Sequence, residues 1–150
     1  MKKAIPVPVP VPDDFKHWPL MMLYTAVIWG EARGESNKAK IAVAWVIRNR
    51  FIRNGWFGDS LRAVLTKKYQ FSCLNPNDVN SQKVRNPLYW DDFKVWAECY
   101  EIAEKVHNGE IKDPTGGATH YFDKSLKDNP PYWAKKLTFT KKIGSFYFYK

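Results

Sequence analysis

The sequence predicts a single α+β domain that is mainly helical, with a small β or loop-rich part at its C-terminal end. Its 150 residues suit one domain. Apolar residues recur at helical spacing over most of the chain, whereas the C-terminal segment contains glycine and proline pairs and short β-like runs. No apolar run approaches the roughly 20 residues that a membrane-spanning helix requires. With 45% hydrophobic and 26% charged residues, the composition also excludes a disordered or collagen-like chain.

The N-terminal segment, residues 1–14, predicts an extended arm outside the domain. Proline alternates with valine from Pro6 to Pro12, which prevents an α-helix and favours a polyproline-type conformation. The same alternation argues against a secretory signal peptide, because no apolar helical region can follow the basic start. We expect a stiff tail that packs on or trails from one folded domain at residues 15–150, with a docking segment for a partner as the alternative.

The first half of the domain predicts two helices. Apolar residues give a broad face to a helix at 19–33, which Gly34 ends. Ser36 is a suitable N-cap for a second helix, and its centre at 41–47 is apolar all round. We therefore expect this second helix to be buried in the middle of the domain and to end at Asn54.

The rest of the domain predicts a short helix, a loop, a long helix and two β-like runs. Asp59 or Ser60 caps the short helix, and turn-forming residues indicate a loop at 69–86. Apolar residues at helical spacing predict an amphipathic helix at 88–107, which Gly109 closes. The β-like runs are expected at 119–122 and 146–149.

Charge and aromatic content leave two classes of partner open. The formal net charge is +9, and the chain contains 7 Trp, 8 Tyr and 9 Phe. Residues 36–70 hold eight of the basic residues against Asp59 alone, so we expect a local basic surface. Such a surface suits a nucleic-acid-binding module or an enzyme acting on an anionic polymer. Cys73 and Cys99 are either two buried thiols, which fit synthesis in the cytoplasm, or one bridge.

Glu31 is the strongest candidate for chemistry. It lies near the end of an apolar helix, between Trp29 and Gly34. Desolvation and the negative end of the helix dipole both raise the pKa of a carboxyl group there, and a general acid must stay protonated near neutral pH. The alternative is a structural glutamate paired with Arg33 or a nearby lysine. Glycosidases that use two carboxyl groups place them on opposite sides of the bond that is cleaved, whereas Glu35 would lie beside Glu31. We therefore expect a mechanism with one carboxyl group. We expect Glu35 to be structural, either as a cap of the second helix or in a pair with a basic residue.

Five segments follow one another along the chain: Gly30–Glu35, Ala42–Arg50, Gln70–Cys73, Asp113–Tyr121 and Ile143-Gly144. In this order they resemble the SleB-type cell wall hydrolases, which are catalytic domains of spore cortex-lytic enzymes and of related phage endolysins. The resemblance implies a lysozyme-like, lytic-transglycosylase-like fold, the glycan strand of peptidoglycan as substrate, and Glu31 as the catalytic acid. We expect no cofactor and no metal, because the cysteines and histidines lack ligand spacing.

The resemblance also implies how one carboxyl group suffices. Glu31 protonates the oxygen between N-acetylmuramic acid and N-acetylglucosamine and then helps the muramyl 6-hydroxyl close a 1,6-anhydro ring; a hydrolytic muramidase is the alternative. Tyr24, two turns earlier on the helix, is expected to support the acid. Cleft walls that bind sugar hydroxyls, acetamido groups and ring faces are expected from Gln70, Phe71, Ser72, Thr119, His120 and Tyr121, with a packing role as the alternative for His120.

We expect no separate wall-binding domain, which favours a phage endolysin among these relatives. We expect synthesis in the host cytoplasm without a signal peptide, and action on the wall, in the periplasm, after the membrane is permeabilised. Expected partners are peptidoglycan strands and, through the basic surface, anionic envelope polymers, with a monomer, no nucleic acid and no stable membrane insertion. An amidase or peptidase using Cys73 and His120 is a further alternative, as is the nucleic-acid-binding module.

Overall fold

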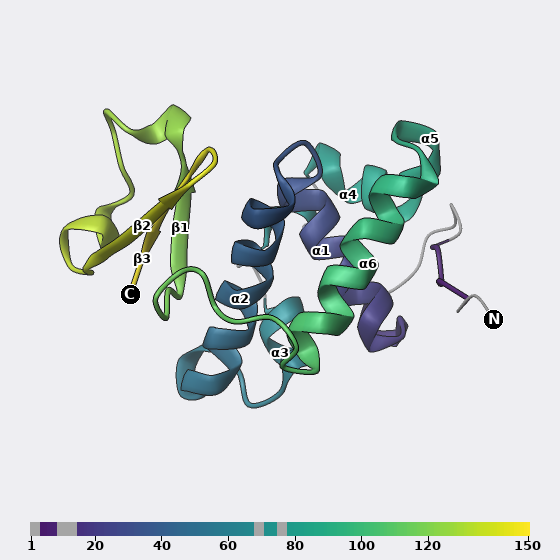
Figure 1. The fold of residues 1–150 in the computed structure, drawn as a ribbon, viewed down its shortest axis with the longest axis horizontal. Coiled ribbons are helices and arrows are strands. Elements are labelled where there is room, and N and C mark those ends of the chain that lie inside the picture. The colour runs from purple at the N-terminus through teal and green to yellow at the C-terminus, as the bar shows by residue number, and fades with distance from the viewer. Residues whose placement is uncertain (1–3, 9–14, 68–70, 75–77) are drawn as a thin grey trace.

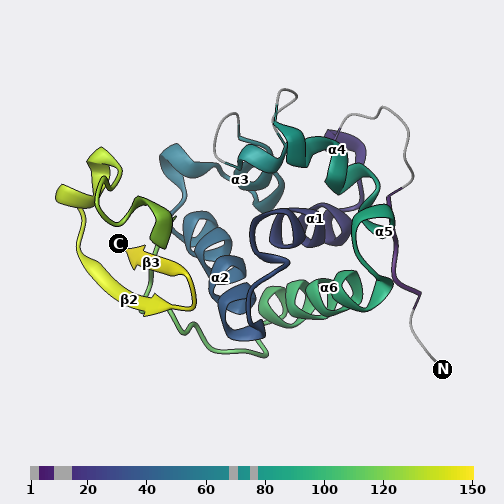
Figure 2. The same cartoon turned by 90° about the horizontal axis from the view of Figure 1, so that it is seen from above.

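The computed structural model describes residues 4–8, 15–67, 71–74 and 78–150, without the side chains of Lys16, Ser72 and Val79. A helical part and a three-stranded sheet lie side by side, with the C-terminus at the sheet (Figure 1). Seen from above, helix α2 lies between the sheet and the pair formed by α1 and α6 (Figure 2). The expected α+β class, mainly helical, is confirmed.

Three helices form the core of the helical part. They are α1 (Leu20–Ala32), α2 (Asn37–Arg53) and α6 (Phe93–His107). Ser36 caps α2 as expected, since its side chain accepts a hydrogen bond from the backbone N–H of Ala39 at 3.2 Å. The α1 helix is buried on almost every side, and its Trp29 ring lies 6.4 Å from that of Trp96 on α6. The core thus encloses α1 up to the residues that precede Glu31.

The shorter helices correct two expectations. The segment expected to be a loop contains α4 (Val79–Arg85), because the Asp78 side chain accepts from the N–H of Asn80 and starts a helix. The long helix expected at 88–107 is two helices, because Asp92 caps α6 and accepts from the N–H of Val95. The remaining short elements are α3 (Leu61–Thr66), α5 (Pro87–Trp90), and the 3-10 turns η1 (Phe15–His17), η2 (Gly55–Phe57), η3 (Ser72–Leu74), η4 (Lys124–Leu126) and η5 (Tyr132–Lys135).

The sheet is antiparallel, in the order β1-β3-β2. Its strands are β1 (His120–Asp123), β2 (Phe139–Ile143) and β3 (Phe146–Tyr149). Strands β1 and β3 correspond to the two expected runs, whereas β2 was not expected. Tyr121 packs on Phe146 and Phe148, which belong to the core, while Phe122 stacks on Tyr147 on the opposite face. The alternation of a strand therefore points Tyr121 toward the helical part.

Residues 4–8 of the N-terminal arm lie against the helical part. Ile5 and Val7 pack on the core, and the indole N–H of Trp96 donates to the carbonyl oxygen of Pro6 at 3.0 Å. Residues 1–3 and 9–14 of the expected arm lie outside the described residues. Both Cys73 and Cys99 are buried free thiols, so the alternative of one bridge is wrong. Among the described helices, none has the length and apolar character needed to cross a membrane.

Candidate active site

Close packing at Gly30 sets the position of Glu31. A Cβ atom at Gly30 would lie 2.7 Å from the Cβ of Cys73 and 3.0 Å from a methyl group of Val84. Only glycine therefore allows the last turn of α1 to approach η3 and α4 this closely. The turn lines an open groove of about 330 Å³, whose walls are residues 30–35 and Asn80.

Glu31 meets the sheet across this junction. The hydroxyl of Tyr121 on β1 donates a hydrogen bond to Oε1 of Glu31 at 2.9 Å. Burial and the nearby Glu31 carboxylate raise the pKa of Tyr121 well above its usual value, so the phenol keeps its proton and remains a donor. Among the expected cleft residues whose side chains are described, Tyr121 is thus the one with a hydrogen bond to Glu31.

The pKa of Glu31 is raised above its usual value, as its sequence position predicts. Burial is the main cause, and Asp78 adds a smaller effect in the same direction. The hydrogen bond from Tyr121 and the positive charge of Arg50 act against it, because both favour the carboxylate. The alternative of an ion pair with Arg33 is wrong in the described part of the chain, since the Arg33 guanidinium instead lies over the Trp29 ring at 4.3 Å.

Arg50 on α2 is a site residue that sequence reasoning missed, although it ends the second family-like segment. Its Nε donates to the carbonyl oxygen of Thr119 at 2.7 Å, and its guanidinium lies 5.4 and 5.2 Å from the rings of Phe57 and Phe71. Burial lowers its pKa, and the charge of Glu31 acts in the opposite direction. A buried cation near Glu31 stabilises the carboxylate that forms when the acid gives up its proton.

The residues before Arg50 hold the segment that leads into β1. Arg48 donates to the carbonyl oxygens of Val106 and His107 at the end of α6. The side-chain amide of Asn49 donates to Oδ2 of Asp113 at 2.9 Å and to the carbonyl oxygen of Ala118 at 3.0 Å. The second and fourth family-like segments therefore interlock, and this contact sets the start of the strand that carries Tyr121.

Glu35 has a structural contact, although with neither of the expected partners. Its Oε1 accepts from the backbone N–H of Ser145 at 3.1 Å, in the turn between β2 and β3. Gly144 has a φ of 57°, which favours glycine, and a Cβ there would lie 3.0 Å from that oxygen and displace it. Glu35 therefore ties one wall of the groove to the sheet, while Ser36 caps α2.

The structure corrects the expected position of three site residues. Tyr24 is fully buried and donates to the carbonyl oxygen of Ala44 at 2.5 Å, so it joins α1 to α2 and presents no surface to a substrate. Phe71 and Thr119 are only 2% and 1% exposed, so they contribute to the packing around the site and present no surface to a substrate. Gln70 lies outside the described residues, and so does the side chain of Ser72.

His120 lies on the opposite face of β1 from Tyr121. Its ring contacts those of Phe57 and Trp133, and its Nδ1 is 3.0 Å from Oγ1 of Thr119. Burial, together with Arg50 and Arg53, lowers the pKa of His120 to about 4, so the ring is neutral at neutral pH. These contacts favour the alternative packing role. No three acidic, histidine or cysteine residues converge as metal ligands in the described parts of the chain.

The sequence profile described as cell wall hydrolase matches residues 34–149. The chain belongs to the cell wall hydrolase family. It is 27% identical over 144 residues to a spore cortex-lytic enzyme of Oceanobacillus iheyensis, covering 95% of this chain and 45% of that protein. It is also 27% identical over 152 residues to the corresponding enzyme of Halalkalibacterium halodurans, covering 99% and 38%. This cell wall hydrolase thus spans less than half the length of these curated relatives.

Two solved structures have the same fold as this cell wall hydrolase. The catalytic domain of the germination-specific lytic transglycosylase SleB from Bacillus anthracis has a TM-score of 0.65 and 25% identity, covering 93% of this chain and all of that one. The catalytic domain of the Bacillus cereus SleB protein has a TM-score of 0.66 and 25% identity, covering 95% of each chain. The expected SleB-type resemblance and lysozyme-like fold are confirmed. Because the family profile begins just after Glu31, the assignment of this residue depends on the geometry of the groove.

Proposed function

We propose that this cell wall hydrolase cleaves the β-1,4 bond between N-acetylmuramic acid and N-acetylglucosamine in peptidoglycan, with Glu31 as the only catalytic carboxyl group. The observation that carries the proposal is the hydrogen bond from Tyr121 on the sheet to Glu31, which lines the open groove. A carboxyl group with a raised pKa that lines an open groove suits a general acid. The solved relative from Bacillus anthracis, named a lytic transglycosylase, supports the choice of reaction.

In the first step, the Glu31 carboxyl protonates the bridging oxygen while the bond between C1 of the muramyl residue and that oxygen breaks. The N-acetylglucosamine chain leaves with a new 4-hydroxyl group, and positive charge develops at C1. The Tyr121 hydroxyl and the Arg50 charge stabilise the Glu31 carboxylate that this step creates. Their stabilising effect on Glu31 is therefore greatest after proton transfer, when the carboxylate has formed.

In the second step, the muramyl 6-hydroxyl attacks C1 and Glu31 accepts its proton. A 1,6-anhydro ring closes without consuming water, and Glu31 is protonated again. This route assigns no step to Glu35, whose Oε1 accepts a hydrogen bond from the backbone N–H of Ser145. One carboxyl group can thus serve as acid and then as base.

Mass spectrometry of the products tests the proposal. Wild-type protein should release fragments with 1,6-anhydromuramic ends from purified peptidoglycan, and Glu31→Gln should lose about 10²–10⁴-fold in rate. Glu35→Gln is the matched control, because its amide oxygen can still accept from Ser145, and it should keep most of the activity. Reducing muramic ends would identify a muramidase instead, and new free amines a peptidase. An active Glu31→Gln would refute the role of Glu31.

The biological setting that we propose is that of a phage endolysin, which is made in the host cytoplasm and reaches the wall after the membrane is permeabilised. The support is chemical: the net charge of +9 favours adsorption to an anionic envelope. Purified protein should lower the turbidity of permeabilised cells and leave intact cells unchanged. Equal lysis of intact cells would contradict the need for a membrane lesion.

A further inference from the structure

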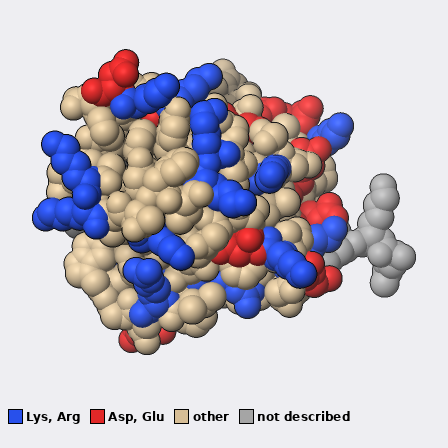
Figure 3. Space-filling view, turned by 60° about the vertical axis from the view of Figure 1, so that its left-hand side comes forward, with Lys and Arg blue, Asp and Glu red and all other residues tan. Residues whose placement is uncertain are grey.

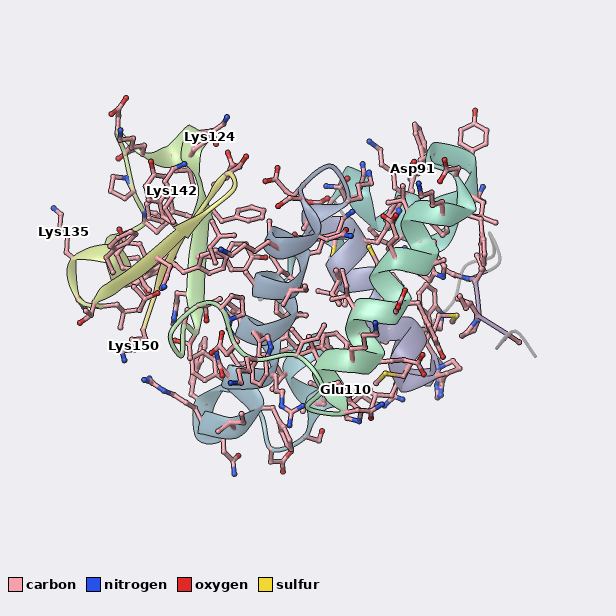
Figure 4. The ribbon with its side chains drawn as sticks, viewed as in Figure 1. Asp91, Glu110, Lys124, Lys135, Lys142 and Lys150 are labelled. Atoms are coloured by element: carbon pink, nitrogen blue, oxygen red, sulfur yellow. The ribbon has the colours of Figure 1, made fainter. Side chains whose placement is uncertain are left out.

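Positive charge is dense around the sheet, whereas acidic residues gather in the segment that contains α6. The seven lysines from Lys124 to Lys150, which we call the lysine surface, are all exposed and share this segment with a single acidic residue, Asp128. Residues 91–110 hold six acidic residues and two lysines. The labelled Lys124, Lys135, Lys142 and Lys150 surround the sheet, whereas Asp91 and Glu110 lie on the helical part (Figure 4). Viewed toward the sheet side, Lys and Arg clearly outnumber Asp and Glu (Figure 3).

The positive charge of the lysine surface is not neutralised by carboxylates of the described residues. None of its lysines forms an ion pair with a carboxylate among the described residues, and Asp123 instead accepts from the N–H of Ser125. The basic segment at 36–70 differs, because Lys40 is buried and 3.8 Å from Glu98, and Arg50 is buried in the site. The expected basic surface at 36–70 is therefore partly internal, and the larger exposed positive surface lies on the sheet.

Part of the lysine surface adjoins the groove that contains Glu31. The backbone N–H of Lys124 donates to the carbonyl oxygen of Ser145 at 2.7 Å, and Nζ of Lys142 donates to that of Gly144 at 3.1 Å. These two lysines therefore flank the β2–β3 turn, whose Ser145 binds Glu35 on the groove wall. A polymer held in the groove would pass beside them.

Exposed aromatic rings accompany the lysines. Tyr132 is 78% exposed and Phe139 is 49% exposed. The Nζ of Lys136 lies 5.6 Å from the centre of the Tyr132 ring, within the range of a cation–π contact. Rings and ammonium groups together can contact sugar faces and carboxylates on one polymer.

We propose that the lysine surface binds the stem-peptide carboxylates of the same peptidoglycan strand whose glycan lies in the Glu31 groove. The proposal rests on the proposed function, because the strand in the groove is what brings its peptides to the sheet. Stem peptides project from the muramyl residues and carry several carboxylates, which complement lysines without ion pairs of their own. The dense positive charge around the sheet would also orient the enzyme with its sheet toward the wall.

Binding of the inactive Glu31→Gln protein to insoluble peptidoglycan, stripped of teichoic acid, tests this inference. A triple variant with Lys124→Gln, Lys135→Gln and Lys142→Gln should bind about fivefold more weakly at low salt. The matched control has Lys94→Gln, Lys105→Gln and Lys112→Gln, which removes the same net charge away from the sheet and should change binding less than about twofold. Salt at about 0.5 M should abolish the difference, because it shortens the Debye length.

The substrate separates peptide binding from glycan binding. On glycan strands freed of peptides by an amidase, which keep only lactyl carboxylates, the sheet variant should bind as the parent does within about twofold. The inference would be overturned if both triple variants lost the same binding affinity or if neither lost any. It would also be overturned if the sheet variant lost as much affinity for peptide-free strands as for intact peptidoglycan. The proposed function fails separately, if the wild-type protein releases no glycan fragments while the two variants still differ in binding.

Discussion

Replacement of Tyr121 by phenylalanine is the most direct test of how the site tunes Glu31. The change removes one hydroxyl, whose 2.9 Å hydrogen bond favours the Glu31 carboxylate, and leaves the ring to pack on Phe146 and Phe148. A hydrogen bond to a charged group contributes about 1.5–3 kcal/mol, and 1.36 kcal/mol corresponds to one pKa unit. Because Glu31 is partly exposed, water replaces some of this stabilisation, so we expect the Glu31 pKa to rise by about one unit.

The sign of the effect follows from the protonation state that the acid needs. With the donor removed, the protonated form of Glu31 persists to higher pH, so the alkaline limb of kcat/KM should move up by about one pH unit. The rate at the optimum should fall about tenfold, because the carboxylate formed after proton transfer loses a donor. Glycan product release across pH measures both effects, and an NMR titration of the Glu31 carboxyl measures the pKa directly.

Tyr147→Phe is the control for this experiment. Tyr147 lies on the other face of the sheet, stacked on Phe122, so its substitution should leave the alkaline limb in place. An unchanged limb in Tyr121→Phe, or a shift to lower pH, would refute the inference that this hydrogen bond holds down the Glu31 pKa.

Two further predictions concern stability. Gly30→Ala should lower the free energy of unfolding by about 1–3 kcal/mol in a denaturant titration, because the added Cβ would lie 2.7 Å from Cys73. Gly34→Ala is the control and should be nearly neutral, because a Cβ there would meet no atom within 4 Å. Since the pKa of His120 is lowered to about 4 in the folded protein, its contribution to stability is present above its ordinary value near 6.5 and is lost as pH falls toward 4. The full shift corresponds to about 2 kcal/mol between pH 7 and pH 5, but His120 is half-buried and solvent screens part of the effect. We therefore expect a loss of about 1 kcal/mol from this group, measured by urea unfolding, and His120→Gln should remove that part of the pH dependence. A pH dependence that is the same in His120→Gln and wild type would contradict the assignment.

Local signals in the sequence predicted several elements correctly. The Ser36 cap and the apolar run after it identified α2 and its burial, because capping and helical periodicity involve neighbouring residues. The β2 strand was missed because most of its side chains are exposed and it contains Lys141 and Lys142, so it lacks a clear apolar alternation. The break before α6 was missed because Asp92 interrupts an otherwise continuous helical pattern and acts as a cap.

The sequence alone determined the candidate acid and the direction of its pKa shift, since an apolar helix end surrounds Glu31 with its own chain neighbours. Only the tertiary structure decided which residues act on that acid. Tyr121 lies 90 positions away, and Arg50 reaches the site from a second helix. Tyr24, close to Glu31 along the same helix, is buried against α2 instead. Helical periodicity gives the relative direction of side chains on one element, but contacts between elements depend on how α1, α2 and β1 pack together.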